Sequence, residues 1–383
     1  MLISAAAVVT GDVVLRPGWI ETADERIVAI GDGAPAGPAG TDFGTGIVVP
    51  GFVDMHVHGG GGATFGQKGG QGESVADVVR TATRFHRSHG TTSMMASLVS
   101  AHPDDLLAQV AELAGPVHDG QLLGIHLEGP WLAPERCGAH QPSALRNPDL
   151  NEIRKVFRAG DGAVRMVTLA PELPGALEAI RFIVDTGAVA AIGHTDASYE
   201  QIRPAIDAGA TVATHLFNAM RPVHHRHPGP AVALIADDGV LVEMIADGLH
   251  LHPAVFRDVC LRAGPDRVAV ITDAIGAAGM PDGPYRLGAL EVTVQDGVAT
   301  VAGADTIAGS TATMDASFRF SMRHNGSGGE DALLGAVRHT SINPARALGL
   351  PARGLLTGVT ADLVVLDADW QVSAVMQRGR WVG

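Results

Sequence analysis

The sequence predicts an α/β protein in which a (β/α)8, TIM-like barrel carries a small β-sandwich domain formed by the N- and C-terminal segments. Two observations predict this fold class. In the middle of the chain, apolar strand-like runs alternate with longer helical stretches, which is typical of βα units around a parallel sheet. At both ends, short apolar stretches alternate with turns, which is typical of antiparallel strands.

The N-terminal pattern covers residues 1 to about 50, where turn signals such as Thr10-Gly11-Asp12 separate short apolar runs. The C-terminal segment repeats this pattern up to Trp381 and Val382. We therefore expect residues 1–50 and 350–383 to pair into one small β domain. Residues 51–349 then remain for the barrel.

Eight candidate strands lie in the central region. They are Phe52–His58, Thr91–Ser97, Leu122–Glu128, Val164–Ala170, Val189–His194, Thr211–His215, Leu241–Asp247 and Val268–Asp273. Helices are expected between them, for example over Glu73–His89, Pro174–Thr186, Ser198–Ala208 and Pro253–Ala263. An open doubly wound sheet is the alternative, but the glycines at 59–62 lack the G-x-G-x-x-G spacing of its phosphate turn. A hairpin is expected over Tyr285–Val301, after the eighth strand.

Composition limits the classes of function. The chain has 383 residues, of which 46% are hydrophobic and 18% charged, which indicates a large globular protein. Its formal net charge of −14 opposes binding to nucleic acids and to anionic membranes. An anionic ligand would therefore need a local basic pocket.

The cysteines and the N-terminus indicate a cellular compartment. Only two cysteines, Cys137 and Cys260, occur, and they lie far apart, so we expect no disulfide framework and a reducing cytoplasm. The first residues lack a basic stretch, and their apolar run is too short to span a bilayer. We expect neither an export signal nor a transmembrane helix.

The ends of the predicted strands carry metal-ligand and acid-base residue types. In a barrel, active sites lie at the C-terminal ends of the strands. The residues found there are His56, His58, Glu128, His194, His215 and Asp273. His56 and His58 alternate on one strand and therefore point the same way. Imidazole and carboxylate groups bind zinc, iron and similar divalent ions, so a metal site is expected here. Any one of these histidines could instead be structural, and Asp273 could cap a helix.

Two loops beyond the strand ends are candidates for substrate binding. Residues 218–229 form the densest basic stretch of this acidic chain, which is either a solvated loop or a phosphate site where an Arg fork matches the oxygen geometry. The loop from Trp131 to His140 has no periodicity, and loops in this position commonly cover a barrel mouth.

Several of these segments together resemble the amidohydrolase superfamily and, within it, the deacetylases of phosphorylated amino sugars, over essentially the whole chain. The motifs are P-G-F-V-D-M-H-V-H-G at 50–59, H-L-E-G-P-W at 126–131, G-H-T-D-A at 193–197, T-H-L-F-N-A-M at 214–220, D-G-L-H at 247–250, T-D-A at 272–274 and A-G-S-T at 308–311. The motif at 50–59 is shared across the superfamily, whereas the motifs at 126–131 and 214–220 are much more specific to these deacetylases.

The resemblance implies that Glu128, His194 and His215 hold one divalent metal and that Asp273 is the catalytic acid-base. His56 and His58 match family members that bind a second ion, so one or two ions are expected per subunit. Zinc is the first choice, with iron, manganese, cobalt or cadmium as alternatives. Many relatives bridge two metals with a carboxylated lysine at the end of strand four, but residues 168–172 hold no lysine. Glu128 can supply the bridging carboxylate instead.

For the substrate, the resemblance implies phosphate contacts from Asn218, Ala219 and Arg226. His250 would also line the site, together with Ala139 and with His140, which would polarise the amide carbonyl. Ile307 and Ala308 would form an apolar wall near the acetyl group. A homodimer is expected, with some of these groups acting across its interface.

The expected reaction is metal-dependent hydrolysis of the acetamide of N-acetyl-D-glucosamine 6-phosphate to D-glucosamine 6-phosphate and acetate, in amino-sugar catabolism or cell-wall sugar recycling. The alternatives are another hydrolase of the superfamily, acting on a cyclic amide or purine ring, and a non-catalytic sugar-phosphate sensor.

Overall fold

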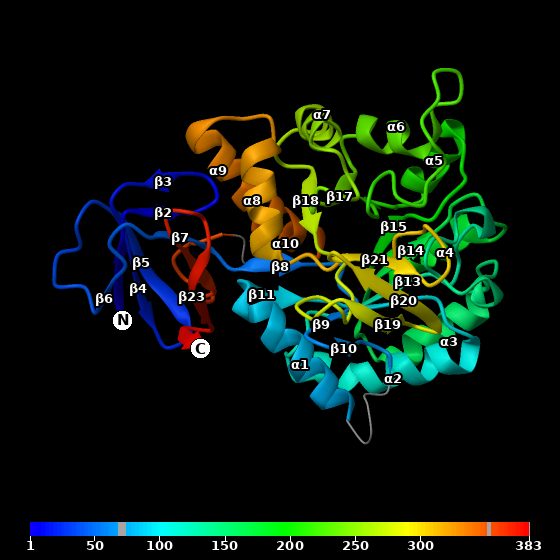
Figure 1. Cartoon of the computed structure of the whole chain (residues 1–383), viewed down its shortest axis with the longest axis horizontal. Coiled ribbons are helices and arrows are strands. Elements are labelled where there is room, and N and C mark those ends of the chain that lie inside the picture. The colour runs from blue at the N-terminus through cyan, green and yellow to red at the C-terminus, as the bar shows by residue number, and fades with distance from the viewer. Residues whose placement is uncertain (68–73, 351–353, 383) are drawn as a thin grey trace.

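The two ends of the chain form neighbouring β-sheets at one end of the molecule, in a computed structural model that describes residues 1–67, 74–350 and 354–382 (Figure 1). One sheet has the strand order β5-β4-β1-β6 and the other β24-β23-β22-β7-β2-β3. β22 (Leu363–Leu366) pairs antiparallel with β7 (Ile47–Pro50), so the C-terminal segment completes a sheet begun near the N-terminus. The remaining strands are β1 (Leu2–Ala5), β2 (Ala7–Val9), β3 (Val14–Leu15), β4 (Gly18–Ala23), β5 (Arg26–Asp32), β6 (Thr41–Asp42), β23 (Val372–Gln377) and β24 (Arg380–Val382).

These two sheets share an apolar core. Burial along β4 alternates from residue to residue, as expected for a strand with one face inward. Ile3 and Ile20 from one sheet and Val48, Leu363 and Met376 from the other belong to the same cluster of buried side chains. The termini are thus held together by apolar burial as well as by strand pairing.

A parallel sheet of seven strands, in the order β12-β13-β14-β15-β16-β17-β18, forms the centre of the protein (Figure 1). A separate parallel pair, β8-β11, precedes it. The strands are β8 (Phe52–Asp54), β11 (Thr91–Met94), β12 (Ala96–Leu98), β13 (Ile125–Glu128), β14 (Val164–Leu169), β15 (Val189–Ile192), β16 (Val212–Ala213), β17 (Leu241–Ile245) and β18 (Val268–Ile271). This curled sheet with helices outside it is a TIM-like architecture.

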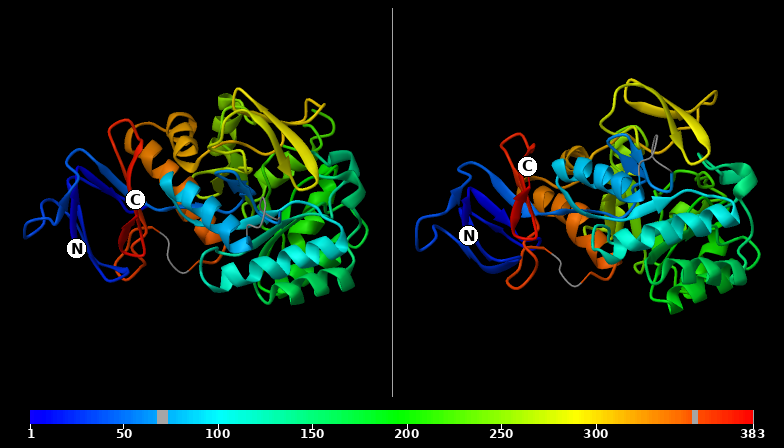
Figure 2. Two further views of the ribbon diagram at one scale, coloured as in Figure 1. Left: turned by 60° about the horizontal axis from the view of Figure 1, so that its bottom comes forward. Right: turned by 90° about the horizontal axis from the view of Figure 1, so that it is seen from below.

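Helices follow the strands and cover the outside of the sheet (Figure 2). They are α1 (Val75–Ser88), α2 (Pro103–His118), α3 (Leu150–Gly160), α4 (Ala176–Asp185), α5 (Tyr199–Asp207), α6 (Gly229–Ala236), α7 (Pro253–Ala263), α8 (Met314–His324), α9 (Gly329–Val337) and α10 (Asn343–Ala347). Short helical turns η1 (Pro134–Arg136) and η2 (Pro142–Ala144) follow β13, and a π-helical turn, η3 (Arg338–Ile342), precedes α10. Within the described residues, no helix is both long enough and apolar enough to cross a membrane.

The predicted helices lie close to the observed ones, and their limits follow from local capping. α1 begins after Ser74, whose hydroxyl accepts from the backbone N–H of Asp77 while the Asp77 carboxylate accepts from the Ser74 N–H. The predicted start of this helix at Glu73 lies outside the described residues. α7 begins at Pro253, a residue that suits the first turn because it has no N–H to satisfy.

The predicted (β/α)8 barrel is TIM-like but not closed, because in the described part of the chain no ladder joins β8 to β18 or β11 to β12. The Asp54 carboxylate occupies this seam, where it accepts from the backbone N–H of Thr272 at 3.3 Å and from its hydroxyl at 2.5 Å. Next to this contact, the backbone N–H of Asp273 donates a hydrogen bond to the carbonyl oxygen of His56 at 2.9 Å. A buried side chain therefore replaces part of the strand pairing that would close the sheet.

The predicted hairpin after the eighth strand is a sheet of three antiparallel strands, β19 (Gly283–Leu287), β20 (Leu290–Gln295) and β21 (Val298–Val301). It stands out from the barrel as the yellow strands of Figure 2. Its buried face, which includes Leu287 and Val292, packs with Ile275, Ala277 and Ala308. The insertion therefore covers the segment that follows Asp273.

Candidate metal centre and active-site cavity

The predicted strand-end residues meet at one mouth of the barrel, and all six are buried. His56 and His58 follow β8, Glu128 ends β13, and His194, His215 and Asp273 follow β15, β16 and β18. The last three adopt positive φ angles of 47°, 25° and 50°, which are unusual for residues with side chains. This conformation bends the chain directly at the strand ends, and such strain is common at functional sites.

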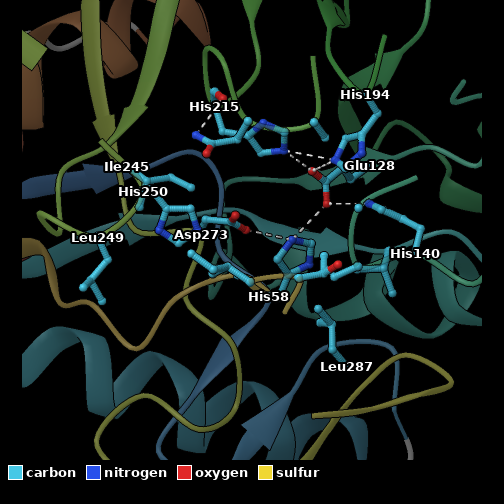
Figure 3. Close-up of a pocket in the computed structure, with 18 residues that line it drawn as sticks. His58, Glu128, His140, His194, His215, Ile245, Leu249, His250, Asp273 and Leu287 are labelled. Carbon is cyan, nitrogen blue, oxygen red and sulfur yellow. Dashed lines mark hydrogen bonds and ion pairs between the residues drawn. The ribbon is translucent and has the colours of Figure 1, made fainter. Parts of the chain in front are cut away.

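Glu128, His194 and His215 form the first ligand cluster (Figure 3). Oε1 of Glu128 lies 3.1 Å from Nε2 of His194 and 2.9 Å from Nε2 of His215. The two Nε2 atoms are 3.1 Å apart. Three such donor atoms around one point suit a zinc-like ion, whose bonds to nitrogen and oxygen are about 2.0–2.2 Å long.

His56, His58 and Asp273 form the second cluster. The Nε2 atoms of His56 and His58 are 3.2 Å apart. Oδ1 of Asp273 lies 3.4 Å from Nε2 of His56 and 3.2 Å from Nε2 of His58. Oε2 of Glu128 is 3.1 Å from His58 Nε2, so the carboxylate of Glu128 lies between the two clusters. It occupies the position expected of a bridging ligand in a chain that lacks the strand-four lysine.

The histidines are oriented as metal ligands require. Nδ1 of His194 is 2.9 Å from the carbonyl oxygen of Arg136, and Nδ1 of His58 is 3.1 Å from that of Ser97. A carbonyl can only accept, so Nδ1 carries a proton in both rings and Nε2 is the nitrogen available for a metal. The Nε2 atoms are the ones that face Glu128 and Asp273. Both clusters therefore fit a divalent ion on donor type, spacing and tautomer.

The charged groups of the centre stabilise one another. Burial alone would raise the pKa of Asp273, but the neighbouring His56 and His58 outweigh it and hold that pKa below its usual value. Burial likewise opposes ionisation of Glu128, yet His56 and His140 hold its pKa well below the usual range. Both carboxylates are therefore ionised near neutral pH.

His140 has the opposite tautomer. Its Nδ1 lies 3.1 Å from the backbone nitrogen of Ser100, which can only donate, so Nδ1 is an acceptor and the proton is on Nε2. Burial, assisted by repulsion from His194, lowers the pKa of His140 to about 4, so the ring is neutral near pH 7. Nε2 points toward Oε2 of Glu128 at 3.3 Å. His140 thus offers an N–H donor beside the metal clusters.

A cavity of about 350 Å³ opens above the clusters. Its walls include six predicted substrate-binding residues, namely Ala139, His140, Asn218, Ala219, His250 and Ile307. Nδ1 of His250 is 2.7 Å from the Asp247 carboxylate, which outweighs the effect of burial and raises the pKa of His250. A cationic His250 would attract an anionic ligand.

Two predicted residues are not in the wall of this cavity. Arg226 lies on an exposed loop, where its guanidinium is 2.7 Å from Nε2 of His225. Ala308 is buried in the apolar cluster beneath the β19-β20-β21 sheet. Neither residue lines the cavity of its own chain, so the structure does not bring these two predicted contacts into the site.

Sequence reasoning missed several wall residues and one buried acid. Val99, Gly138, Ile245, Leu249, Leu287, Thr306 and Gly309 also line the cavity. Gly138 has a φ of 55°, and a Cβ there would lie 3.1 Å from Cε1 of His194, so glycine favours this close approach of the loop to His194. Glu243 is fully buried on β17, and an acidic residue inside an otherwise apolar run was the available signal.

Comparison with known proteins agrees with this arrangement. A family profile described as the amidohydrolase family matches residues 47–382. The chain is 39% identical over 354 residues to N-acetylglucosamine-6-phosphate deacetylase of Bos taurus, covering 89% of this chain and 84% of the relative. It is 33% identical over 374 residues to N-acetylgalactosamine-6-phosphate deacetylase of Escherichia coli O157:H7, covering 95% of each.

A solved structure extends the likeness to the whole chain. It is a mutant N-acetyl-D-glucosamine-6-phosphate deacetylase from Mycobacterium smegmatis in complex with N-acetyl-D-glucosamine-6-phosphate. Its sequence is 56% identical, and the superposition has a TM-score of 0.96 and covers 100% of this chain and 98% of that chain.

Proposed function

The chain belongs to the amidohydrolase family, and from this membership we infer that it hydrolyses the acetamide of N-acetylglucosamine 6-phosphate to glucosamine 6-phosphate and acetate. One observation carries the proposal: two adjacent ligand clusters, with the Glu128 carboxylate between them, open onto a cavity of about 350 Å³. The 56% identity to the Mycobacterium smegmatis deacetylase supports the choice of substrate. The reaction belongs to amino-sugar catabolism or cell-wall sugar recycling.

The protein's cofactor is a divalent metal. Glu128, His194 and His215 would hold the first ion, and His56 and His58, with Asp273 beside them, would hold a second. Zinc suits this mixed nitrogen and oxygen donor set best, and iron, manganese, cobalt and cadmium are the alternatives. The exposed fraction of each of these side chains is 10% or less, which protects the ligands from competing water.

Asp273 is the proposed acid-base group. A bound divalent ion lowers the pKa of a water molecule toward neutrality and polarises the substrate carbonyl. Asp273 is ionised because its own pKa is held low by the histidines beside it, so its carboxylate can accept a proton from the attacking water. It then returns that proton to the amine nitrogen, which leaves poorly without it.

His140 is the proposed donor to the carbonyl oxygen. Its protonated Nε2 faces Glu128. The ring is neutral near pH 7, so it acts as a hydrogen-bond donor and not as a cation. As the amide carbon becomes tetrahedral, negative charge grows on the oxygen, and a fixed N–H donor stabilises that charge more than the ground state.

The phosphate-binding proposal rests on Asn218, Ala219, His250 and Arg226. The first three line the cavity, and His250 brings positive charge to it. Arg226 lies on an exposed loop outside the cavity of its own chain, and we propose a homodimer in which this loop serves a neighbouring subunit. Ala139 and Ile307 would hold the sugar and acetyl group, whereas Ala308, which is buried beneath the β19-β20-β21 sheet, does not line the cavity.

The galactosamine epimer is the second candidate substrate, because the Escherichia coli relative is an N-acetylgalactosamine-6-phosphate deacetylase and is 33% identical over nearly the whole chain. Acetate release should be measured with N-acetylglucosamine 6-phosphate, its galactosamine epimer and unphosphorylated N-acetylglucosamine. We expect the first to react with the highest kcat/KM. Equal rates with and without phosphate would overturn the phosphate site, and absence of acetate from all three would overturn the reaction.

Two broader expectations belong to the same proposal. Residues 1–50 and 350–383 form the small β domain and residues 51–349 the barrel, and the pairing of β22 with β7 supports this division. The predicted boundary includes residues 351–353, which lie outside the described residues.

The cytoplasm is the proposed compartment, supported by two cysteines, Cys137 and Cys260, that are not disulfide-bonded.

A further inference from the structure

We propose that Glu243 is a positioning residue for the second metal site, acting through His56, so that it determines whether the second ion is retained. The inference rests on the metal sites of the proposed function. It concerns a residue that touches neither the substrate cavity nor the first ligand cluster's ring nitrogens. A change at Glu243 should therefore alter the number of bound ions directly, and the rate of hydrolysis only as a result.

Glu243 is buried without an apparent structural need for an acid. It lies in the middle of β17, among Leu241, Val242, Met244 and Ile245, and its side chain is completely inaccessible. Burying a carboxylate is costly unless it is paired or hydrogen-bonded. Oε1 of Glu243 has no hydrogen-bond partner among the described residues. The free-energy cost of burying the Glu243 carboxylate is therefore offset only by the contacts of Oε2.

The contacts of Oε2 point to the second metal site. This atom lies 3.3 Å from Nδ1 of His56 and 3.3 Å from the backbone nitrogen of His215. The first contact is to the ring of a second-site ligand. The second contact is to the main chain of a first-site ligand and leaves its imidazole untouched.

His56 differs from the other ligands in the kind of group that orients it. His58 and His194 donate from Nδ1 to neutral backbone carbonyls, and Nδ1 of His215 has no partner among the described residues. Only His56, within this set, has a carboxylate beside Nδ1. A carboxylate fixes the ring with its proton on Nδ1 and increases the electron density at Nε2, which strengthens the bond to a metal.

The position of His56 makes this orientation decisive for the second ion. Its Nε2 lies 3.2 Å from that of His58 and 3.4 Å from Asp273, so it completes a three-ligand cluster. Without the charge on Glu243, either ring nitrogen of His56 can carry the proton, and protonated Nε2 cannot bind a metal. The first cluster keeps Glu128, His194 and His215 in either case.

The test compares wild-type protein with Glu243→Gln, which keeps the size and an acceptor oxygen but removes the charge. Bound metal per chain is counted by elemental analysis after dialysis, and dissociation constants are measured by zinc titration. We expect about two ions in the wild type and about one in the variant, with the second dissociation constant weakened roughly 10–100-fold. The first constant should not change.

Glu172→Gln is the matched control. The Glu172 carboxylate accepts from the hydroxyl of Thr195 and the backbone N–H of Asp196, both at 2.6 Å, beside the ligand His194. It touches no ligand ring, so its variant should retain both ions. Equal loss of the second ion from both variants would overturn the specific role of Glu243.

Glu243→Asp provides a second measurement if the glutamine variant does not fold. It retains the charge but withdraws it from His56 by one methylene, so it should also lose the second ion first. Two ions bound at wild-type affinity in either variant would overturn the inference, as would parallel loss of both ions with a lower melting temperature. If the wild type binds only one ion, the proposed second metal site is wrong, and the role of Glu243 is wrong with it. If the wild type and every variant bind two ions, the second metal site stands and only the role of Glu243 is wrong.

Discussion

The Asp196 carboxylate is bound to the Arg136 guanidinium, with Oδ1 of Asp196 lying 2.8 Å from Nε and 2.7 Å from an Nη atom. Its other oxygen accepts from Arg221 at 2.6 Å. Arg136 belongs to the loop that carries His140, and its carbonyl also orients the ring of His194. Asp196 therefore fastens two loops at the cavity to the strand end that bears His194, a proposed metal ligand.

Replacing Asp196 with Asn should loosen both loops without unfolding the protein. These three side chains are about a quarter to a third exposed, and ion pairs of this kind contribute only about 0–1 kcal/mol to the free energy of unfolding. We expect kcat/KM to fall roughly ten-fold, which corresponds to about 1.4 kcal/mol of transition-state binding. Asp207→Asn, which breaks an exposed pair with Arg203, is the control and should leave kcat/KM unchanged.

Asp273→Asn should abolish turnover while leaving substrate binding intact. The amide cannot accept a proton from water or return one to the amine, and such groups contribute about 10²–10⁴-fold to rate. Steady-state kinetics with substrate binding measured by calorimetry checks this. A kcat near that of the wild type would exclude Asp273 as the acid-base group.

His140→Ala should reduce kcat by roughly 10²–10³-fold, the usual effect of removing one oxyanion donor. The KM should change less, because the bond strengthens only as charge develops. Since the pKa of His140 lies at about 4, its ring stays neutral above about pH 5. The pH profiles of wild-type and His140→Gln enzymes should therefore show no difference in shape between pH 6 and 8, and a new ionisation in that interval would contradict the assignment.

Replacing His56 and His58 together should reduce the number of bound ions from about two to about one. The reason is that Glu128, His194 and His215 form a ligand set of their own. Elemental analysis gives the count, and chelation followed by zinc addition should remove and restore activity in the wild type. Loss of all metal from the double variant would instead show that the two clusters bind as one unit.

Asp315→Asn should lower stability by roughly 1–3 kcal/mol at pH 7, because Asp315 accepts from Arg319 at 2.9 Å and lies 3.1 Å from Nδ1 of His89. Burial raises the pKa of Asp315, but its hydrogen bonds outweigh burial and lower it below the unfolded value. The contribution is therefore complete above about pH 5 and is lost as the pH falls through the folded-state pKa. Denaturant titrations of both proteins should converge in acid, and a constant difference would refute this origin.

Much of the candidate site was predictable because it follows from position along strands. The C-terminal ends of parallel strands meet at one edge, so six acidic or imidazole side chains at those ends had to converge whatever their sequence separation. His56 and His58 were expected to share a strand face, and although β8 ends at Asp54, before both of them, their Nε2 atoms still lie 3.2 Å apart. The family-specific motifs then indicated which small molecule such a centre serves.

Other features depended on contacts between segments that no local pattern relates. The carboxylate of Asp54 replaces strand pairing at the barrel seam, and the three-stranded sheet after β18 packs on the segment that follows Asp273. The tautomer of His140 is set by Ser100, a residue 40 positions away. Arg226 remained outside its own cavity, although its sequence neighbours Asn218 and Ala219 reached it.

Residue types and strand periodicity in the sequence were thus sufficient to indicate a TIM-like architecture and a divalent metal site, while the family resemblance was needed to propose Asp273 as the acid-base group. Only the tertiary structure assigned each ring nitrogen its partner, brought Glu243 to His56 and tied Arg136 to Asp196. The physical reason is range. Side-chain direction along a strand is a local property, whereas the hydrogen bond that orients a buried imidazole depends on packing that forms only when distant segments fold together.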